Sequence, residues 1–233
     1  MVTVPVAVFA SGGGSNFQSL LDHQSPDNPG RIKLLISDRP AAGALERAER
    51  VGIPTIVIPV AGRSLEEVGE ETLAILRERE IQVILLAGYL RLIPPAVIAA
   101  FPKRILNIHP ALLPAFGGKG MWGRHVHEAV LASGACFSGP TIHFVDEEYD
   151  TGSILAQWPV PALGTDTPDT LAARVLVLEH LLYPLAAEAL CRAVVEGREP
   201  SRLSPPGGAV HIGSDLDLDS LRAQIRASFY GVE

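Results

Sequence analysis

The sequence predicts an α/β protein built on a doubly wound, largely parallel sheet. Its first half contains continuous apolar runs, each bounded by Gly, Pro or a polar cluster, as expected of strands that are buried on both faces. These runs are Val4–Ala10, Ile32–Ile36, Ile53–Ile58 and Ile81–Ala87, and helix-like segments lie between them at Asn16–Asp22, Ala42–Val51 and Leu65–Arg79. Strands that alternate with helices at this interval imply right-handed βαβ crossovers, which make neighbouring strands parallel.

The remaining elements follow in chain order. A short helix at Pro94–Phe101 precedes the apolar run Arg104–His109, which is predicted to be a short buried strand because the prolines after it stop further pairing. The later segments are predicted as a helix at His125–Ser133, strands at Thr141–Val145 and Ile154–Val160, and a long helix from about Asp169 to Glu196 with Gly197 as its stop.

Length and composition indicate one globular domain with an appended tail. A chain of 233 residues, 47% of them hydrophobic, can bury a full core. Residues 1–197 are predicted to form the domain and residues 198–233 a Pro- and Gly-rich linker followed by a short helix. Apolar residues of the tail recur at helical spacing, so we expect this helix to dock on the domain or on a partner; they are Leu218, Leu221, Ile225 and Phe229.

Charge and cysteine usage limit the partners. A net charge of -7 and a pI near 5.5 provide no basic stripe for phosphate backbones, so nucleic acid is not expected as a partner. Cys136 and Cys191 lie far apart without C-x-x-C spacing, which fits a reducing cytoplasm and buried thiols. The N-terminus lacks a basic leader and no later apolar stretch is expected to span a bilayer, so we expect a cytoplasmic protein that does not use a membrane.

Asn107, His109 and Asp150 are the candidate catalytic residues. Asn107 and His109 fall at the C-terminal end of a predicted strand, and their period-two spacing points both side chains the same way. An amide, an imidazole and a carboxylate are sufficient for acyl transfer without a covalent enzyme intermediate, because one polarises a carbonyl, one carries a proton and one orients the carrier. A lone Asn or His at a strand end is more often a turn residue or a satisfied histidine, so spacing alone leaves that alternative open.

A glycine loop, Ser11-Gly12-Gly13-Gly14-Ser15-Asn16, directly follows the first predicted strand. Glycines permit close approach of backbone to a ligand, and free N–H groups at a helix N-terminus bind anions. A tight βα turn without a ligand explains the loop equally well. A nucleotide site is a further alternative, because Asp38 follows the second strand, but Phe17 replaces the third glycine of the dinucleotide fingerprint and no Lys follows the loop. A phosphate monoester therefore fits better than NAD or ATP.

Four motifs occur together and in order along residues 4–197. They are Ser11–Asn16, Leu86–Ile93, the run Asn-Ile-His-Pro-Ala-Leu-Leu-Pro at 107–114, and Thr141–Gly152, with Leu178-Glu179-His180 beyond them. In these motifs the chain resembles the phosphoribosylglycinamide formyltransferase family, folate-dependent enzymes of purine synthesis. The resemblance implies a Rossmann-like formyltransferase fold with an antiparallel edge towards the C-terminus.

The same resemblance implies the reaction and the catalytic roles. The amine of glycinamide ribonucleotide would attack the formyl carbon of 10-formyltetrahydrofolate directly, through a tetrahedral intermediate and without a metal. Asn107 would donate to the formyl oxygen, while His109 would stabilise the oxyanion and move a proton to the departing folate nitrogen. Asp150 would hold His109 and favour its charged form.

Substrate-binding residues are implied in the same way. Those implied for the ribonucleotide are Gly14, Ser15 and Asn16 at the phosphate and Glu179 at the ribose or glycinamide end. Those implied for the folate are Leu90, Arg91, Leu92 and Ile93 on one wall of the pterin slot, and Asn107, Asp146, Glu147, Glu148, Tyr149 and Asp150 on the other. Each has an ordinary alternative as a solvated, turn or core residue.

Two departures from the family pattern leave contacts open. The loop 115–124 is longer than in the commonest form, and a basic residue for the folate tail has no clear counterpart, because Arg63 is near but Leu65 stands at the equivalent place. The resemblance implies nothing about the tail 198–233, and a monomer and a homodimer both remain open.

Five alternative functions compete. Formyltransferases acting on an amino sugar or on methionyl-tRNA, and a deformylase, share the catalytic trio, but the latter two usually carry an additional domain that this chain is not expected to have. A nucleotide-binding regulatory module would bind without transferring formyl. A zinc hydrolase using His125 and His127 is disfavoured, because these side chains diverge at the start of a helix.

Overall fold

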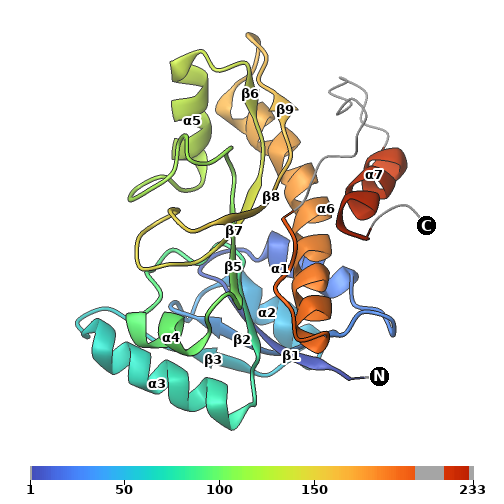
Figure 1. Ribbon diagram of the computed structural model, residues 1–233. Coiled ribbons are helices and arrows are strands. Elements are labelled where there is room, and N and C mark those ends of the chain that lie inside the picture. The colour runs from blue at the N-terminus through green and yellow to red at the C-terminus, as the bar shows by residue number, and fades with distance from the viewer. Residues whose placement is uncertain (1, 203–217, 231–233) are drawn as a thin grey trace.

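The computed structural model describes residues 2–202 and 218–230, with the side chains of residues 219–227 in the last helix. Seven strands form one sheet in the order β3-β2-β1-β4-β5-β7-β8 (Figure 1). Their bounds are β1 Val4–Phe9, β2 Gly30–Ser37, β3 Thr55–Val57, β4 Val83–Leu86, β5 Ile105–His109, β7 Thr141–Phe144 and β8 Ile154–Gln157. The first five strands are parallel, whereas β7 and β8 pair antiparallel. The predicted α/β class and antiparallel edge are confirmed.

Helices cover both faces of the sheet. On one face lie α1 (Ser15–Asp22), α2 (Gly43–Arg50) and the long helix α6 (Pro168–Val195), and on the other lie α3 (Leu65–Glu78) and α4 (Pro95–Ala100). Strand residues alternate between the two cores: Val6 and Val8 of β1 face the first, and Ala7 and Phe9 face the second. Burial on both faces explains why these strands are continuous apolar runs rather than alternating ones.

The segment predicted as one strand at Ile154–Val160 is divided in the structure. Strand β8 ends at Gln157, and β9 (Val160–Pro161) belongs to a separate two-stranded antiparallel sheet with β6 (Phe137–Ser138). The division falls at Trp158-Pro159, because a proline has no N–H to continue the ladder. Helix α5 (Arg124–Ser133) lies directly before β6.

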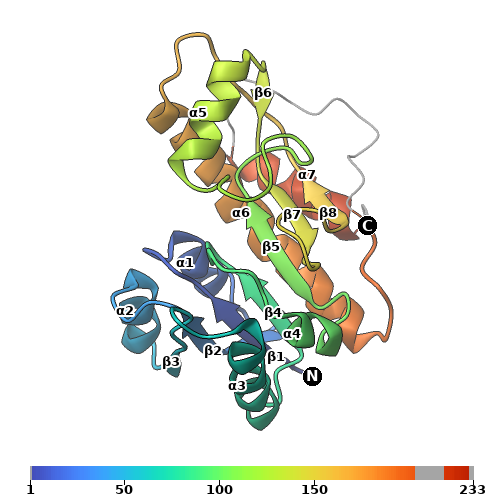
Figure 2. The same cartoon turned by 90° about the vertical axis from the view of Figure 1, so that its left-hand side faces the viewer.

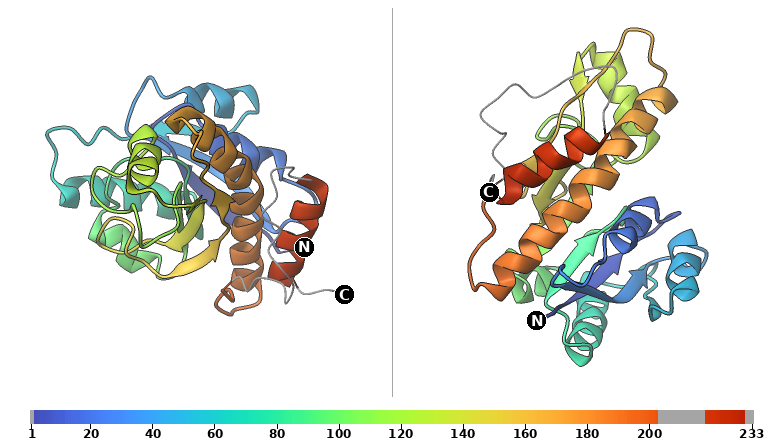
Figure 3. Two further views of the ribbon diagram at one scale, coloured as in Figure 1. Left: turned by 90° about the horizontal axis from the view of Figure 1, so that it is seen from above. Right: turned by 90° about the vertical axis from the view of Figure 1, so that its right-hand side faces the viewer.

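Helix α6 contradicts the expectation that no later stretch is long and apolar enough to span a bilayer. It has 28 residues, and by length and composition it meets that criterion. Yet 61% of its most apolar window is buried inside the protein. The helix lies along the sheet and packs against α1 and α5 (Figures 1 and 3). Its apolar character is therefore that of a core helix.

The tail helix α7 (Leu218–Tyr230) docks on α6 (Figure 3). Leu221 and Ile225, four residues apart and so on one helix face, are buried in the same core as α6. The side chains of Leu218 and Phe229, which were also predicted to be on the apolar face of this helix, lie outside the described residues. So does most of the predicted linker. The expectation that the tail docks on the domain is confirmed for this face, while its separation from function stays a prediction.

We expect truncation after Gly197 to lower the melting temperature but leave kcat within a few-fold at a temperature where the shortened protein stays folded. Each large apolar side chain buried by α7 contributes ~1.5–3 kcal/mol. The point variant Leu221→Ala should lower the free energy of unfolding by ~2–5 kcal/mol, and Arg222→Ala, at an exposed position of the same helix, is its control. Loss of turnover in a folded truncation, with unchanged circular dichroism, would show that the tail contributes to the active site.

Candidate active site

A cavity of about 680 Å³ opens at the C-terminal ends of β4 and β5. Strand β1 lies between β2 and β4: the chain adds β2 and β3 on one side of β1 and then returns to add β4 and β5 on the other (Figure 2). Such a switch point is where ligands bind in open α/β sheets. The walls of the cavity come from the loops after β4, β5 and β7 and from one face of α6.

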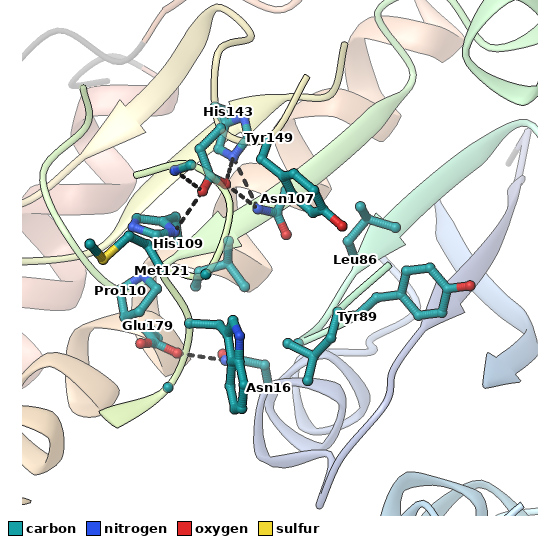
Figure 4. A pocket seen from close by; sticks show the side chains of 18 of the residues that line it. Asn16, Leu86, Tyr89, Asn107, His109, Pro110, Met121, His143, Tyr149 and Glu179 are labelled. Carbon is teal, nitrogen blue, oxygen red and sulfur yellow. Dashed lines mark hydrogen bonds and ion pairs between the residues drawn. The ribbon is translucent and has the colours of Figure 1, made fainter. Parts of the chain in front are cut away.

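His109 ends β5 with its side chain buried in the cavity wall (Figure 4). Its Nε2 lies 2.9 Å from the carbonyl oxygen of Phe116, and its Nδ1 lies 3.4 Å from Oδ2 of Asp150. A carbonyl only accepts hydrogen bonds, so Nε2 carries a proton and donates it to Phe116. The nitrogen that gains and loses a proton is therefore Nδ1, which lies beside the carboxylate.

Three groups from different segments surround the carboxylate of Asp150. The backbone N–H of Gly118 donates to Oδ2 at 2.9 Å, while Nδ2 of Asn107 and Nε2 of His143 lie 3.4 and 3.5 Å from Oδ1. Asp150 itself has φ 61, in the left-handed region, where Asp is better tolerated than most residues. The predicted trio is thus brought together around this one carboxylate.

His143 is a site residue that the sequence prediction did not include. Its Nδ1 lies 2.8 Å from the Phe144 carbonyl and so carries a proton, which leaves Nε2 to accept from Nδ2 of Asn107 at 3.0 Å (Figure 4). His143 thereby fixes which way the Asn107 amide faces. In the sequence His143 could be noticed only as a member of the 141–152 motif. Its pairing with Asn107 depends on the antiparallel register of β7 against β5.

Burial and neighbouring charges set the pKa values of His109 and Asp150. Burial lowers the pKa of His109, and the nearby Asp150 charge raises it less than burial lowers it. Asp150 therefore favours the charged form of His109, as expected, but desolvation outweighs this effect in the free protein. Burial alone would raise the pKa of Asp150, but the neighbouring His143 and His109 side chains and the Gly118 N–H together lower it. The resting pair is a neutral imidazole beside a carboxylate.

At the other end of the cavity Asn16 meets Glu179. Nδ2 of Asn16 donates to Oε2 of Glu179 at 2.6 Å, joining the start of α1 to α6, and both residues line the cavity (Figure 4). Burial raises the pKa of Glu179, and the Asn16 hydrogen bond opposes it. Gly14 and Ser15 precede Asn16 but are not among the described residues that line this cavity.

Gly14 is required by the fold as well as by any ligand. Its φ of 75 is left-handed, and a Cβ built there would meet the Ala44 Cα and Cβ of α2 at 2.8 Å. Packing against α2 therefore excludes a side chain at Gly14. At Gly12 and Gly13 a Cβ would meet nothing within 4 Å, so these positions face open space.

Nearly all of the residues expected to bind folate line the cavity. All of them line it except Glu147, which is not among its described lining residues; those that do are Leu90, Arg91, Leu92, Ile93, Asn107, Asp146, Glu148, Tyr149 and Asp150. The loop whose contacts were open also contributes, through residues 118–124. Within it, Met121 faces the cavity (Figure 4).

Two charged candidates are committed elsewhere. Asp38, the acid that a nucleotide site would use, is buried and accepts from Nε of Arg91 at 2.8 Å, so it anchors the loop after β4. Arg63, the candidate for the folate tail, pairs with Glu71 at 2.6 Å and donates to the Glu67 carbonyl in the first turn of α3 at 3.3 Å, and it is not among the described residues lining the cavity. Neither position supports the role considered for it.

The zinc alternative gains no support from the geometry. His127 is buried and lines the cavity, whereas His125 is exposed and lies near Glu128. Among residues 2–202 and 218–230, no group of three or more His, Cys, Asp or Glu side chains is arranged to hold a metal ion.

Comparison with known proteins defines the class. Residues 4–187 match the family model described as formyl transferase. The chain is 51% identical over 197 residues to a phosphoribosylglycinamide formyltransferase, chloroplastic, of Arabidopsis thaliana, covering 83% of this chain and 68% of that protein. Among solved structures, phosphoribosylglycinamide formyltransferase from Brucella melitensis has 45% identity and a TM-score of 0.73, covering 80% and 94% of the two chains. Glycinamide ribonucleotide transformylase 1 from Symbiobacterium toebii has 37% identity and a TM-score of 0.76, covering 90% and 94%.

The chain therefore belongs to the formyl transferase family. The relatives named above are all glycinamide ribonucleotide formyltransferases, and the chain is an enzyme of that branch.

The buried histidines predict how stability depends on pH. Burial lowers the pKa of His109, His127 and His180 below the usual 6.5. Below about pH 6.5 the unfolded chain therefore binds more protons than the folded one, so the free energy of unfolding should fall as the pH drops from 7 to 5. Carboxylates with lowered pKa, such as Asp150, add their own loss only nearer pH 4.

Urea unfolding at half-unit pH steps measures this slope. The variant His127→Asn should flatten it between pH 7 and 5, while His125→Asn, at an exposed position of the same helix, should leave it unchanged. A free energy of unfolding that is constant or rises towards pH 5 would contradict the prediction.

Proposed function

We propose that this enzyme transfers the formyl group of 10-formyltetrahydrofolate to the amine of glycinamide ribonucleotide in purine biosynthesis. The observation that carries the proposal is the cluster of Asn107, His109 and Asp150 at one end of a cavity whose other end holds Asn16 and Glu179. One end supplies hydrogen-bond and proton chemistry, and the other adjoins a glycine loop suited to phosphate. The names of the relatives agree with both halves.

In this reaction the amine nitrogen bonds to the formyl carbon and loses a proton, the bond from that carbon to the folate nitrogen breaks, and the folate nitrogen gains a proton. His109 suits both proton steps. Its neutral Nδ1 accepts the proton of the amine and then donates the same proton to the leaving folate nitrogen, so His109 ends the reaction in its starting protonation state. The carboxylate of Asp150, 3.4 Å away, stabilises the imidazolium between the two steps.

Asn107 meets the negative charge that develops on the formyl oxygen. One N–H of its amide is used by His143 at 3.0 Å, but the other makes only a long 3.4 Å contact with Asp150. A hydrogen bond of that length is weak, so this N–H is available to a stronger acceptor. The amide is already oriented by His143 and needs no reorganisation when the charge forms.

The folate slot and the ribonucleotide end take the remaining residues. Leu90 to Ile93 and the 146–150 segment form two walls for a flat ring, and Ser11 Oγ holds the first wall by accepting from the Leu90 N–H at 3.0 Å. Gly14, Ser15 and Asn16 serve the phosphate through backbone N–H groups, and Glu179 contacts the ribose or glycinamide. The proposed substrates are thus small molecules. Cytoplasmic localisation remains a prediction, which cell fractionation would test.

An absorbance assay of the folate product, run with a panel of amines, tests the proposal. Turnover with glycinamide ribonucleotide and not with an amino sugar nucleotide or methionyl-tRNA is expected. Folate product released without any amine would instead indicate a deformylase, and binding of the ribonucleotide without turnover would indicate a regulatory module.

We expect His109→Ala and Asp150→Asn each to lower kcat by at least ~10²-fold, the usual contribution of general acid–base catalysis, with little change in either KM. Because the two side chains act on one proton, the double variant should be far from additive. Steady-state kinetics on the three variants provide the test. A near-normal kcat in either single variant would remove the pair from the mechanism.

Activity should survive EDTA, and purified protein should carry no stoichiometric zinc, because hydrogen-bond donors and a proton carrier are sufficient for this transfer. Elemental analysis together with the absorbance assay measures both. One metal ion per chain, with turnover lost on its removal and restored on its return, would favour the hydrolase alternative.

A further inference from the structure

Two groups of helix α2 donate hydrogen bonds to backbone carbonyls of the glycine loop. The N–H of Ala44 donates to the carbonyl of Gly12 at 3.1 Å, and Nε of Arg47 donates to the carbonyl of Gly13 at 2.8 Å. The same guanidinium reaches α1, where Nη1 donates to Oε1 of Gln18 at 3.2 Å. Arg47 therefore joins the loop, α1 and α2 at one point.

These contacts decide which way the loop amides point. In a trans peptide the carbonyl of one residue and the N–H of the next point in opposite directions. With the carbonyls of Gly12 and Gly13 turned towards α2, the N–H groups of Gly13 and Gly14 point away from it. Within the described part of the chain, the N–H groups of residues 12–16 donate no hydrogen bond, so five successive donors are available to a ligand.

The Arg47 contact is not replaced by packing alone. Gly13 and Gly43 lie so close that a Cβ on Gly43 would approach Gly13 Cα at 3.3 Å. Neither residue has a side chain, however, whose packing could fix the orientation of the Gly13–Gly14 peptide. Glycine is the residue with the most backbone freedom, so three in succession need an external contact to hold one orientation. Arg47 provides that contact and a permanent positive charge beside the loop.

We propose that Arg47 is a positioning residue for the phosphate end of the ribonucleotide: it orients the Gly13–Gly14 peptide so that the loop N–H groups face the phosphate, and its charge strengthens their hold. The inference rests on the proposed function for the identity of the substrate. It assigns to α2 a role in binding that the candidate site residues, which all lie on other segments, do not include.

The test compares Arg47→Met with Arg50→Met. Methionine keeps most of the aliphatic packing of arginine and removes the charge and the donors. Arg50 lies on the same helix, and its Nε donates to the Glu46 carbonyl within that helix, so its variant is a matched control.

For Arg47→Met we expect KM for the ribonucleotide to rise about tenfold or more, with kcat and KM for folate within about twofold, because a charged hydrogen bond is lost at one substrate only. Arg47→Lys should recover part of the loss, since it keeps the charge and one donor.

Calorimetric titration with inorganic phosphate separates this inference from the proposed function, because it needs no turnover. Weaker phosphate binding in Arg47→Met than in both wild type and Arg50→Met supports the inference even if wild type transfers no formyl group. Equal phosphate affinity in the three proteins, a ribonucleotide KM unchanged in Arg47→Met, or equal rises in both KM values would overturn it. If Arg47→Met does not fold, Arg47→Lys decides, with a rise confined to the ribonucleotide KM supporting the role and an equal rise in both KM values overturning it.

Discussion

The site depends on keeping one carboxylate ionised inside the cavity wall. Burying Asp150 is costly unless polar groups surround it: the loop 115–124 donates the Gly118 N–H, and side chains of β5 and β7 lie against the other carboxylate oxygen. The antiparallel strand β7 is what places His143 opposite Asn107, and the loop returns to supply both the Gly118 N–H and the Phe116 carbonyl. The proton chemistry of Asp150 and His109 therefore depends on both the strand order of the sheet and the path of the loop 115–124.

Elements buried on both faces could be predicted because their sequence pattern has a single physical cause. The runs that became β1 and β4, and residues 34–36 of β2, are apolar, since successive residues face the two cores in turn. Strands β6 and β9 have two residues each, too few for any periodicity, and Pro159 separates β9 from β8. The burial of α6 was likewise hidden, because an apolar run looks the same in a core as in a bilayer.

For the site, spacing alone places Asn107 and His109 side by side, because alternate residues of a strand share a face. Asp150 was a candidate by its chemistry and by resemblance rather than by spacing, and the structure brings it to His109. His143, the Phe116 carbonyl and the lowered pKa of His109 could not be inferred from sequence, because each depends on register, loop path or depth of burial. Glu147 shows the same limit, since a run of acidic residues does not indicate which one faces the cavity.

Helix α6 links the two ends of the cavity. Glu179 on this helix accepts from Asn16 at the ribonucleotide end. One turn later, and so on the same face, the buried hydroxyl of Tyr183 contacts the carbonyls of Leu86 and Leu106, at 2.9 and 3.2 Å, where β4 and β5 approach the site. Asn107 follows Leu106 directly, so one rigid helix sets the distance between the residue that meets the formyl oxygen and the residue that meets the ribonucleotide. Two substrates held by separate walls react only if those walls keep a fixed separation, and a long core helix provides it at little entropic cost.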